Sequence, residues 1–310
     1  MKTFWKQQPK KKSSGKKKTT PPRPRKKPEP WTPPYPRQPK QPRTIPPLTV
    51  TPPEKKIIDV PFTEEKREQP VRARTEFLKT FRKMTGRRRA FEVWSDFVTM
   101  AACAISNAVD PSHYEEREQR YMETIAGYSS EEQNLFPLLM AHTVLALEEN
   151  PEQDFLGSLY MELGLTDKNR DQFFTPYHIC DLMGRITMED LLEQVQEKGV
   201  ASINDPCCGA GATLIAAINE ARRQLMPAGL NFQDHILVSG QDVDEVVALM
   251  CYIQISLLGV AGYVKVGNSI TEPMTQRDAA EDYWLTPIYC LSPIWQFRRA
   301  LQGMDIGDII

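Results

Sequence analysis

The sequence has no pair of cysteines in C-x-x-C spacing, and its six cysteines are scattered along 310 residues: Cys103, Cys180, Cys207, Cys208, Cys251 and Cys290. This distribution argues against a zinc site and against a disulfide framework, and a reducing cytoplasm tolerates it. No stretch reaches the roughly 18 consecutive apolar residues that a membrane-spanning helix needs. The basic start is not followed by the apolar segment of a secretory signal. We therefore expect a cytoplasmic protein with no metal site and no membrane span.

The first part of the chain also has little that could form a core. Residues 1–72 contain more than half of the 26 prolines and most of the lysine runs, which predicts a disordered arm with polyproline character. Residues 1–90 carry 27 Lys and Arg against 7 Asp and Glu, whereas residues 91–310 carry 12 against 33. A basic arm of this kind is typical of nucleic-acid binding through phosphates, and a solubilising tail is the alternative.

The periodicity of apolar residues changes along the rest of the chain. Residues 73–170 place them three to four apart in successive segments, which predicts a helical region. Residues 171–310 then alternate between short apolar runs and longer amphipathic runs. Strands are expected over 200–205, 235–242 and 263–268, with helices between them and a fourth strand over 287–292. This alternation predicts an α/β domain with a parallel, Rossmann-like sheet.

A glycine-rich turn follows the first expected strand, in the stretch NDPCCGAGATLIAA. Gly209 and Gly211 allow a sharp turn and a close approach of the backbone to a ligand. A third glycine three residues later is missing, which weakens a dinucleotide-binding interpretation. Asp242 ends the second strand, where such folds hold ribose hydroxyls; the alternative role is helix N-cap, for which Asp244 is better placed.

Four motifs occur in an order that resembles a known family: QFFTPYHICDLM, DPCCGAGATLI, GQDVD and VGNSITEP. In this order and spacing, over roughly residues 130–275, the chain resembles adenine-specific DNA methyltransferases. The pattern is similar to the methylation subunits of type I restriction–modification systems and to methylase-like proteins of bacterial mobile elements. The resemblance implies a Rossmann-like methyltransferase sheet, S-adenosylmethionine as cofactor and DNA as partner.

The resemblance also implies which residues hold the cofactor. In the family, the segment before the first strand and the glycine turn surround the methionine part, the acid after the second strand holds the ribose, and the residue after the third strand contacts the adenine. The corresponding residues here are Gln172, Phe173, Phe174, Thr175, Pro176, Tyr177, Asp205, Cys207, Cys208, Gly209, Gly211, Asp242 and Asn268. Cys207 and Cys208 are interpreted as small loop residues, not as metal ligands.

The sequence lacks the tetrad [DNS]-P-P-[FYW] through which the amino-methylating families act on a flipped base. The best substitute is the segment with Ser292, Pro293 and Trp295, which we take as the catalytic candidate; Thr286–Tyr289 is a second one. Few residues follow Trp295. We therefore expect either that the sheet is shortened or that a specificity or completing subunit supplies the missing part of the methyltransferase domain.

Three hypotheses stay open at this point. The first is methyl transfer to the exocyclic amine of adenine in DNA. The second is a catalytically inactive relative that binds S-adenosylmethionine and nucleic acid. The third is a helical interaction protein whose glycine turn binds no cofactor.

Overall fold

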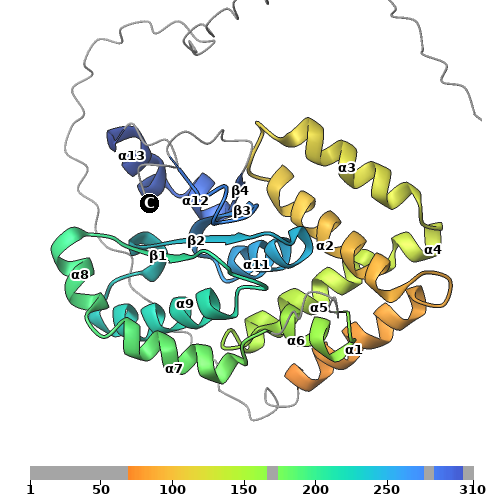
Figure 1. Ribbon diagram of the computed structural model, residues 1–310, viewed down its shortest axis with the longest axis horizontal. Helices are drawn as coiled ribbons and strands as arrows, with labels where there is room; N and C mark the ends of the chain where they lie inside the picture. The colour runs from red at the N-terminus through yellow and green to blue at the C-terminus, as the bar shows by residue number, and fades with distance from the viewer. Residues whose placement is uncertain (1–68, 166–173, 276–282, 303–310) are drawn as a thin grey trace, which may run out of the picture. The chain divides into compact units, whose positions relative to one another are not determined.

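The computed structural model describes residues 69–165, 174–275 and 283–302, so the predicted arm lies outside it up to residue 68. Figure 1 shows a group of helices beside a small sheet. The helices before the sheet are α1 (Gln69–Met84), α2 (Ala90–Asn107), α3 (Tyr114–Ala126), α4 (Ser130–Gln133), α5 (Leu135–Glu149), α6 (Phe155–Glu162), α7 (Tyr177–Thr187) and α8 (Leu191–Lys198). Helices are thus present throughout the described part of the region where the periodicity predicts them.

In the described part of the chain, three parallel strands and one antiparallel strand form the sheet, in the order β1-β2-β3-β4. The strands are β1 (Ala201–Asp205), β2 (Ile236–Asp242), β3 (Ala261–Val266) and β4 (Tyr283–Leu285). Helix α9 (Ala212–Leu225), the short η2 (Met226–Ala228) and α10 (Phe232–His235) connect β1 to β2, and α11 (Glu245–Leu257) connects β2 to β3. The predicted α/β class is therefore confirmed, with parallel pairing limited to the first three strands.

The prediction of a strand over residues 287–292 was wrong, because Pro287–Leu291 forms helix α12 and Pro293–Gln302 forms α13. Pro287 stands at the first helical position, where its fixed φ suits a helix and its missing N–H costs nothing. The Thr286 hydroxyl donates to the Val260 carbonyl at 2.8 Å and accepts from the Gly262 N–H at 2.9 Å, which fixes this end of β4 beside the start of β3. A short apolar run does not distinguish helix from strand by periodicity alone.

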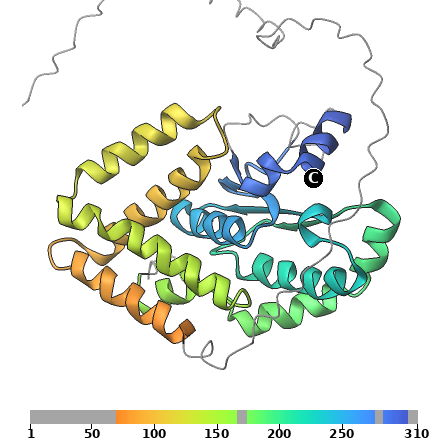
Figure 2. The same ribbon diagram turned by 180° about the vertical axis from the view of Figure 1, so that it is seen from behind.

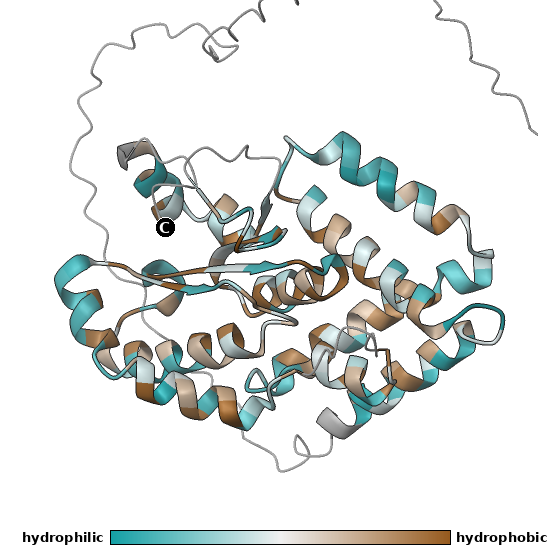
Figure 3. Cartoon of the chain, viewed as in Figure 1, coloured by the Kyte–Doolittle hydropathy of each residue, from teal (hydrophilic) through white to brown (hydrophobic). Residues whose placement is uncertain are grey.

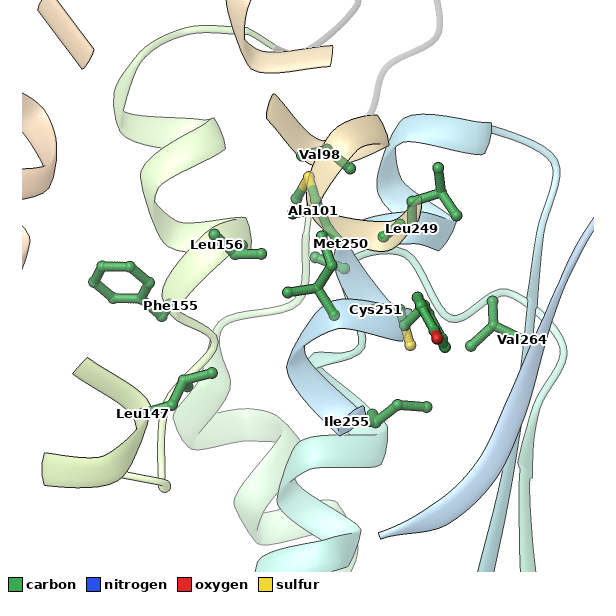
Figure 4. Packing of buried hydrophobic residues seen from close by; sticks show 14 of the residues in the cluster. Val98, Ala101, Leu147, Phe155, Leu156, Leu249, Met250, Cys251, Ile255 and Val264 are labelled. Carbon is green, nitrogen blue, oxygen red and sulfur yellow. The ribbon is translucent and has the colours of Figure 1, made fainter. Parts of the chain in front are cut away.

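Helix α11 is apolar on nearly every side, and all residues from Val247 to Ser256 are buried. Figure 4 shows it between the strands and the helices α2, α5 and α6, which contribute side chains such as Val98, Leu147 and Phe155. In Figure 3 its ribbon is mostly brown, whereas α3 at the outer edge is mostly teal. A helix that is hydrophobic all round belongs in the middle of a domain. The helical region and the sheet consequently share one hydrophobic core.

Helices cover both faces of the sheet, as Figure 2 shows from behind. α9 and α11 pack on one face, and α12 packs on the other through Tyr289, which lies 5.8 Å from the Tyr263 ring of β3. Among the described residues, no helix is long and apolar enough to cross a membrane. This arrangement leaves the carboxyl ends of β1, β2 and β3 at one edge of the sheet, where the glycine turn lies.

Candidate functional site

The glycine turn leads directly from β1 into α9. The Asp205 carboxylate accepts a hydrogen bond from the Cys207 N–H at 3.0 Å, and the Cys208 N–H donates to the Gln241 carbonyl at 3.0 Å. Gly209 and Gly211 have φ angles of 51° and 95°, which favour glycine over any residue with a side chain. The turn therefore passes close over the end of β2.

Asp242 holds this turn in place from the end of β2. One carboxylate oxygen accepts from the Gly209 N–H at 2.9 Å, and the other accepts from the Asp244 N–H at 3.0 Å. Burial raises the pKa of Asp242, the two backbone N–H groups oppose this effect, and the neighbouring carboxylates of Asp244 and Asp205 add to it. A carboxylate has about four lone-pair sites, so two remain for ligand hydroxyls. Asp244 itself caps α11 by accepting from the Val246 N–H at 3.0 Å, as its sequence position predicts.

We expect Gly211→Ala to lower the free energy of unfolding by about 2–4 kcal/mol, since it adds overpacking to backbone strain. A Cβ at Gly211 would lie 2.8 Å from the Cys251 sulfur and 3.3 Å from the Cys251 Cα. Gly229 has a similar φ of 75° and open space around it, so Gly229→Ala measures the strain alone, at about 1 kcal/mol. Urea unfolding of both variants checks this, and equal losses would rule out the contact with Cys251.

The described part of the QFFTPY segment lies beside the turn. A Cβ on Gly209 would lie 3.6 Å from the Phe174 ring, and that ring stacks on Tyr160 with centroids 5.8 Å apart. Thr175 and Pro176 are exposed, and Pro176 precedes the first residue of α7. Gln172 and Phe173 lie outside the described residues. The structure thus brings Phe174 together with Gly209, as the order of the motifs predicts.

Two other predicted residues are held in different ways. The Tyr177 hydroxyl accepts from Asn219 at 3.2 Å, two helical turns beyond Gly211 along α9, and burial raises the pKa of Tyr177 to about 12. Tyr177 therefore packs against α9, with its hydroxyl away from the turn. Asn268 is exposed, and its side-chain oxygen accepts from the Ile270 N–H at 2.9 Å, which leaves its amide N–H groups for a ligand.

The two adjacent cysteines have different environments. Cys207 is exposed, and its sulfur lies 3.9 Å from the Ser269 hydroxyl in the loop after β3. Cys208 is buried; the thiol of Cys251 and burial raise its pKa, so it stays a thiol. No group of three metal-ligating side chains occurs in the part of the chain that the structure describes.

A buried network behind the turn was not predicted from the sequence. The Gln254 side chain donates to the Ala210 carbonyl and to the Asp154 carboxylate, both at 2.8 Å, and accepts from the Leu156 N–H at 3.1 Å. Burial raises the pKa of Asp154, which caps α6 through the Gly157 N–H. The sequence signal for this network is the single glutamine, Gln254, within the apolar run EVVALMCYIQISL. The network ties the turn to the helical region.

Two exposed apolar side chains near the strand ends were also missed. Val243, between Asp242 and Asp244, is 65% exposed, and Ile270 in the loop after β3 is 88% exposed. A valine between two aspartates at a strand end was a signal that sequence reasoning could have used. Both side chains offer apolar surface to a flat ring at the same edge as Asp242.

The structure does not bring Ser292, Pro293 and Trp295 to this edge. Trp295 is buried, and its indole N–H donates to the Gln233 carbonyl at 2.8 Å, three residues before β2 begins. Arg298 of the same helix donates to the Gly199 carbonyl at 3.0 Å, two residues before β1. The second candidate, Thr286–Tyr289, lies beside Val260, just before β3. Both segments thus lie at the amino ends of the strands, opposite Asp205 and Asp242.

Comparison with known proteins supports the family that the motifs indicate. Residues 153–295 match the family model described as N-6 DNA Methylase. The match confirms the predicted resemblance to adenine-specific DNA methyltransferases over these residues. No curated protein gives a significant match.

A solved structure also matches, a putative class I S-adenosylmethionine-dependent methyltransferase from Listeria monocytogenes. The identity is 16% and the TM-score 0.33, and the alignment covers 65% of this chain and 55% of that chain. The chain thus spans about half the length of that structure. The similarity is too weak to assign any residue.

Proposed function

We propose that the chain binds S-adenosylmethionine at the carboxyl ends of β1 and β2. The observation that carries this proposal is the Asp242 carboxylate, which is fixed by the Gly209 and Asp244 N–H groups and keeps acceptor capacity for two ribose hydroxyls. The φ angles of Gly209 and Gly211 place backbone without side chains beside it. Ligands of open α/β sheets bind at this edge.

The residues around Asp242 fit the rest of this cofactor. Val243 and Ile270 offer exposed apolar surface for the adenine ring, and the Asn268 amide provides N–H donors for its edge. Phe174, against Gly209, borders the space next to the turn where the methionine part would lie. Thr175 and Pro176 lie in the same segment, whereas the hydroxyl of Tyr177 is held at Asn219.

We further propose that the acceptor of the methyl group is the exocyclic amine of adenine in DNA. The cofactor supplies the activated methyl group when it is bound. This chain's contribution is to orient the cofactor through Asp242 and the glycine turn and so to bring the two reactants together.

We also propose that the protein is cytoplasmic. All six of its cysteines are free, which fits a reducing compartment.

The target base needs a site at the same edge, and we propose that a partner subunit completes it. Among the described residues β1 pairs with β2 alone, so its other side offers unpaired backbone groups next to Asp205. Extended segments add to such edges through main-chain hydrogen bonds. Neither Ser292–Trp295 nor Thr286–Tyr289 is positioned to supply this site, because both lie at the amino ends of the strands.

The proposal is tested by measuring S-adenosylmethionine binding by calorimetry and methyl incorporation into unmethylated DNA with the same preparation. Binding without incorporation by the chain alone is the expected result, and incorporation should appear only after a partner is added. Incorporation by the chain alone would contradict the need for a partner. Absence of binding would contradict the cofactor site itself.

Removal of residues 1–68 is expected to abolish most of the salt-dependent affinity for DNA, because this segment concentrates lysine and arginine. The logarithm of the binding constant falls with the logarithm of salt by about 0.9 per neutralised phosphate, so the slope should flatten in the truncated chain. Fluorescence anisotropy with a duplex at several salt concentrations measures it. An unchanged slope would show that the arm does not bind DNA. A chain in which only Lys10, Lys11 and Lys12 are replaced by glutamine should show an intermediate slope.

A further inference from the structure

The described part of the chain begins with a strongly basic stretch, residues 69–89, which forms α1 and the turn that leads into α2. This stretch contains eight Lys and Arg residues and one acidic residue, Glu76. Residues 91–310 have the opposite balance, with 12 basic residues against 33 acidic ones. The summed charges therefore attract an anionic partner to α1 and repel it from most of the chain that follows.

Five of the eight basic side chains are exposed and unpaired. No hydrogen bond or ion pair within the described residues engages the side chains of Arg72, Arg82, Lys83, Arg87 and Arg89. Of the other three, Lys79 pairs with Glu76 of the same helix at 2.7 Å, and Arg74 and Arg88 contact neighbouring elements. The surface of α1 thus keeps five positive charges that nothing in this stretch neutralises.

Arg74 and Arg88 hold α1 and its turn in place. Arg74 donates to the Ser158 hydroxyl of α6 at 3.0 Å. Arg88 donates to Glu92 in the first turn of α2 at 2.7 Å, and its guanidinium lies 4.1 Å from the centre of the Tyr128 ring. The carboxylate of Glu92 is thereby neutralised, and the exposed basic side chains are presented from a fixed backbone.

The opposite face of α1 is apolar and buried, with Phe77, Phe81 and Met84 in the core. Over residues 72–84 every exposed side chain is polar or charged. A helix that lies on a membrane surface needs an exposed apolar face that it can bury among the lipids. Because the apolar face of α1 is already covered, its basic face suits a partner that offers phosphates alone, as a nucleic acid does.

The length of α1 matches a stretch of duplex. Its 16 residues span about 24 Å at 1.5 Å per residue. A DNA strand carries one phosphate per 3.4 Å of helix axis, so α1 extends beside about seven base pairs. Four of the five unpaired side chains lie within eight residues at its carboxyl end: Arg82, Lys83, Arg87 and Arg89. A cluster of this density can neutralise several neighbouring phosphates.

A row of aromatic rings connects α1 to the glycine turn. Phe77 of α1 lies 5.9 Å from the Trp94 ring, and Trp94 lies 5.8 Å from Tyr160. Tyr160 stacks on Phe174, which borders Gly209. Close-packed interiors deform little, so a partner bound on α1 is held at a fixed position relative to the turn.

We propose that the outer face of α1 and of the turn after it binds the phosphate backbone of double-stranded DNA through Arg72, Arg82, Lys83, Arg87 and Arg89. Phosphate contacts position a duplex without reading its sequence. This surface is separate from the strand edge proposed for methyl transfer, and it adds an ordered contribution to that of residues 1–68. The choice of DNA as the nucleic acid rests on the proposed function.

The test compares two double variants of the full chain by fluorescence anisotropy with a DNA duplex at several salt concentrations. Arg82→Gln with Lys83→Gln removes two charges from the last turn of α1. Lys198→Gln with Arg222→Gln is the matched control, because it removes two exposed charges from the last turns of α8 and α9. Net charge and helix-end effects are then equal in the two variants.

We expect the α1 variant to flatten the plot of log binding constant against log salt by about 1.8, or about 0.9 for each lost phosphate contact. Its affinity at about 0.1 M salt should fall by about tenfold or more. The control variant should keep the slope of the parent. Circular dichroism should show all three proteins folded.

Calorimetric titration with S-adenosylmethionine separates this surface from the proposed cofactor site. The α1 variant should bind the cofactor as the parent does while it binds DNA more weakly. A parent that binds DNA through α1 but does not bind S-adenosylmethionine would support the α1 surface and contradict the cofactor site alone.

Two outcomes would overturn the proposal. The first is an equal slope for the two double variants, because the location of the charges would then not matter. The second is tighter binding to an RNA duplex of the same sequence or to vesicles of anionic phospholipid, lost in the α1 variant, because either result would identify a different partner for this face.

Discussion

Replacement of Gln254 by leucine is expected to lower the free energy of unfolding by about 3–5 kcal/mol, the largest stability effect expected in this chain. The substitution removes one side chain that serves the Ala210 carbonyl, the Asp154 carboxylate and the Leu156 N–H, with distances of 2.8–3.1 Å. Gln254 is fully buried, so water cannot replace it without a cavity. The melting temperature should fall by roughly 10 °C.

The control for this prediction is Gln194→Leu, at an exposed position of α8, which should change the stability by about 0.5 kcal/mol or less. Thermal and urea unfolding of the two variants should therefore differ clearly. Because the Ala210 carbonyl belongs to the glycine turn, Gln254→Leu should also weaken S-adenosylmethionine binding. A variant as stable as the parent would show that the network contributes no stability.

Replacement of Asp242 by alanine is expected to weaken S-adenosylmethionine binding by about tenfold or more, from lost hydrogen bonds to the ribose worth roughly 1.5–3 kcal/mol. The structure adds a second reason, because the carboxylate also holds the Gly209 and Asp244 N–H groups at 2.9 and 3.0 Å. The loss of these bonds lets the turn move away from the strand end. Calorimetric titration measures the effect.

Asp244→Ala provides the matched control for the neighbouring carboxylate. Asp244 caps α11, so its loss should cost about 1 kcal/mol of stability. Affinity for the cofactor should stay close to that of the parent. If both variants lost affinity equally, destabilisation of α11 rather than loss of a ribose contact would explain the result for Asp242.

The parts of the site that sequence analysis predicted are local in the chain. The stretch DPCCGAG folds as a strand end, a turn with two positive φ angles and a helix start, and the acid at the end of the next strand lies against that turn. Each of these features depends on residue types within a few positions of one another. The chemistry of glycine and of a carboxylate at a strand end is enough to predict them.

The features that were missed depend on contacts between distant residues. Gln254 meets Asp154 across 100 positions. The position of Ser292–Trp295 depended on the direction of β4, which turns the chain back to the amino ends of the strands. Neither the apolar periodicity of the sequence nor the spacing of its motifs reveals whether β4 runs parallel or antiparallel to β3.

The burial of α11 has a consequence for how the chain can come apart. This helix packs on β2 and β3 on one side and on α2, α5 and α6 on the other, and its Gln254 reaches the glycine turn. Limited proteolysis should therefore find no cut that releases the helices as a folded fragment, because either half alone would expose the surface that α11 covers. We therefore expect the helices and the sheet to unfold together, because α11 packs against both and Gln254 ties it to the turn.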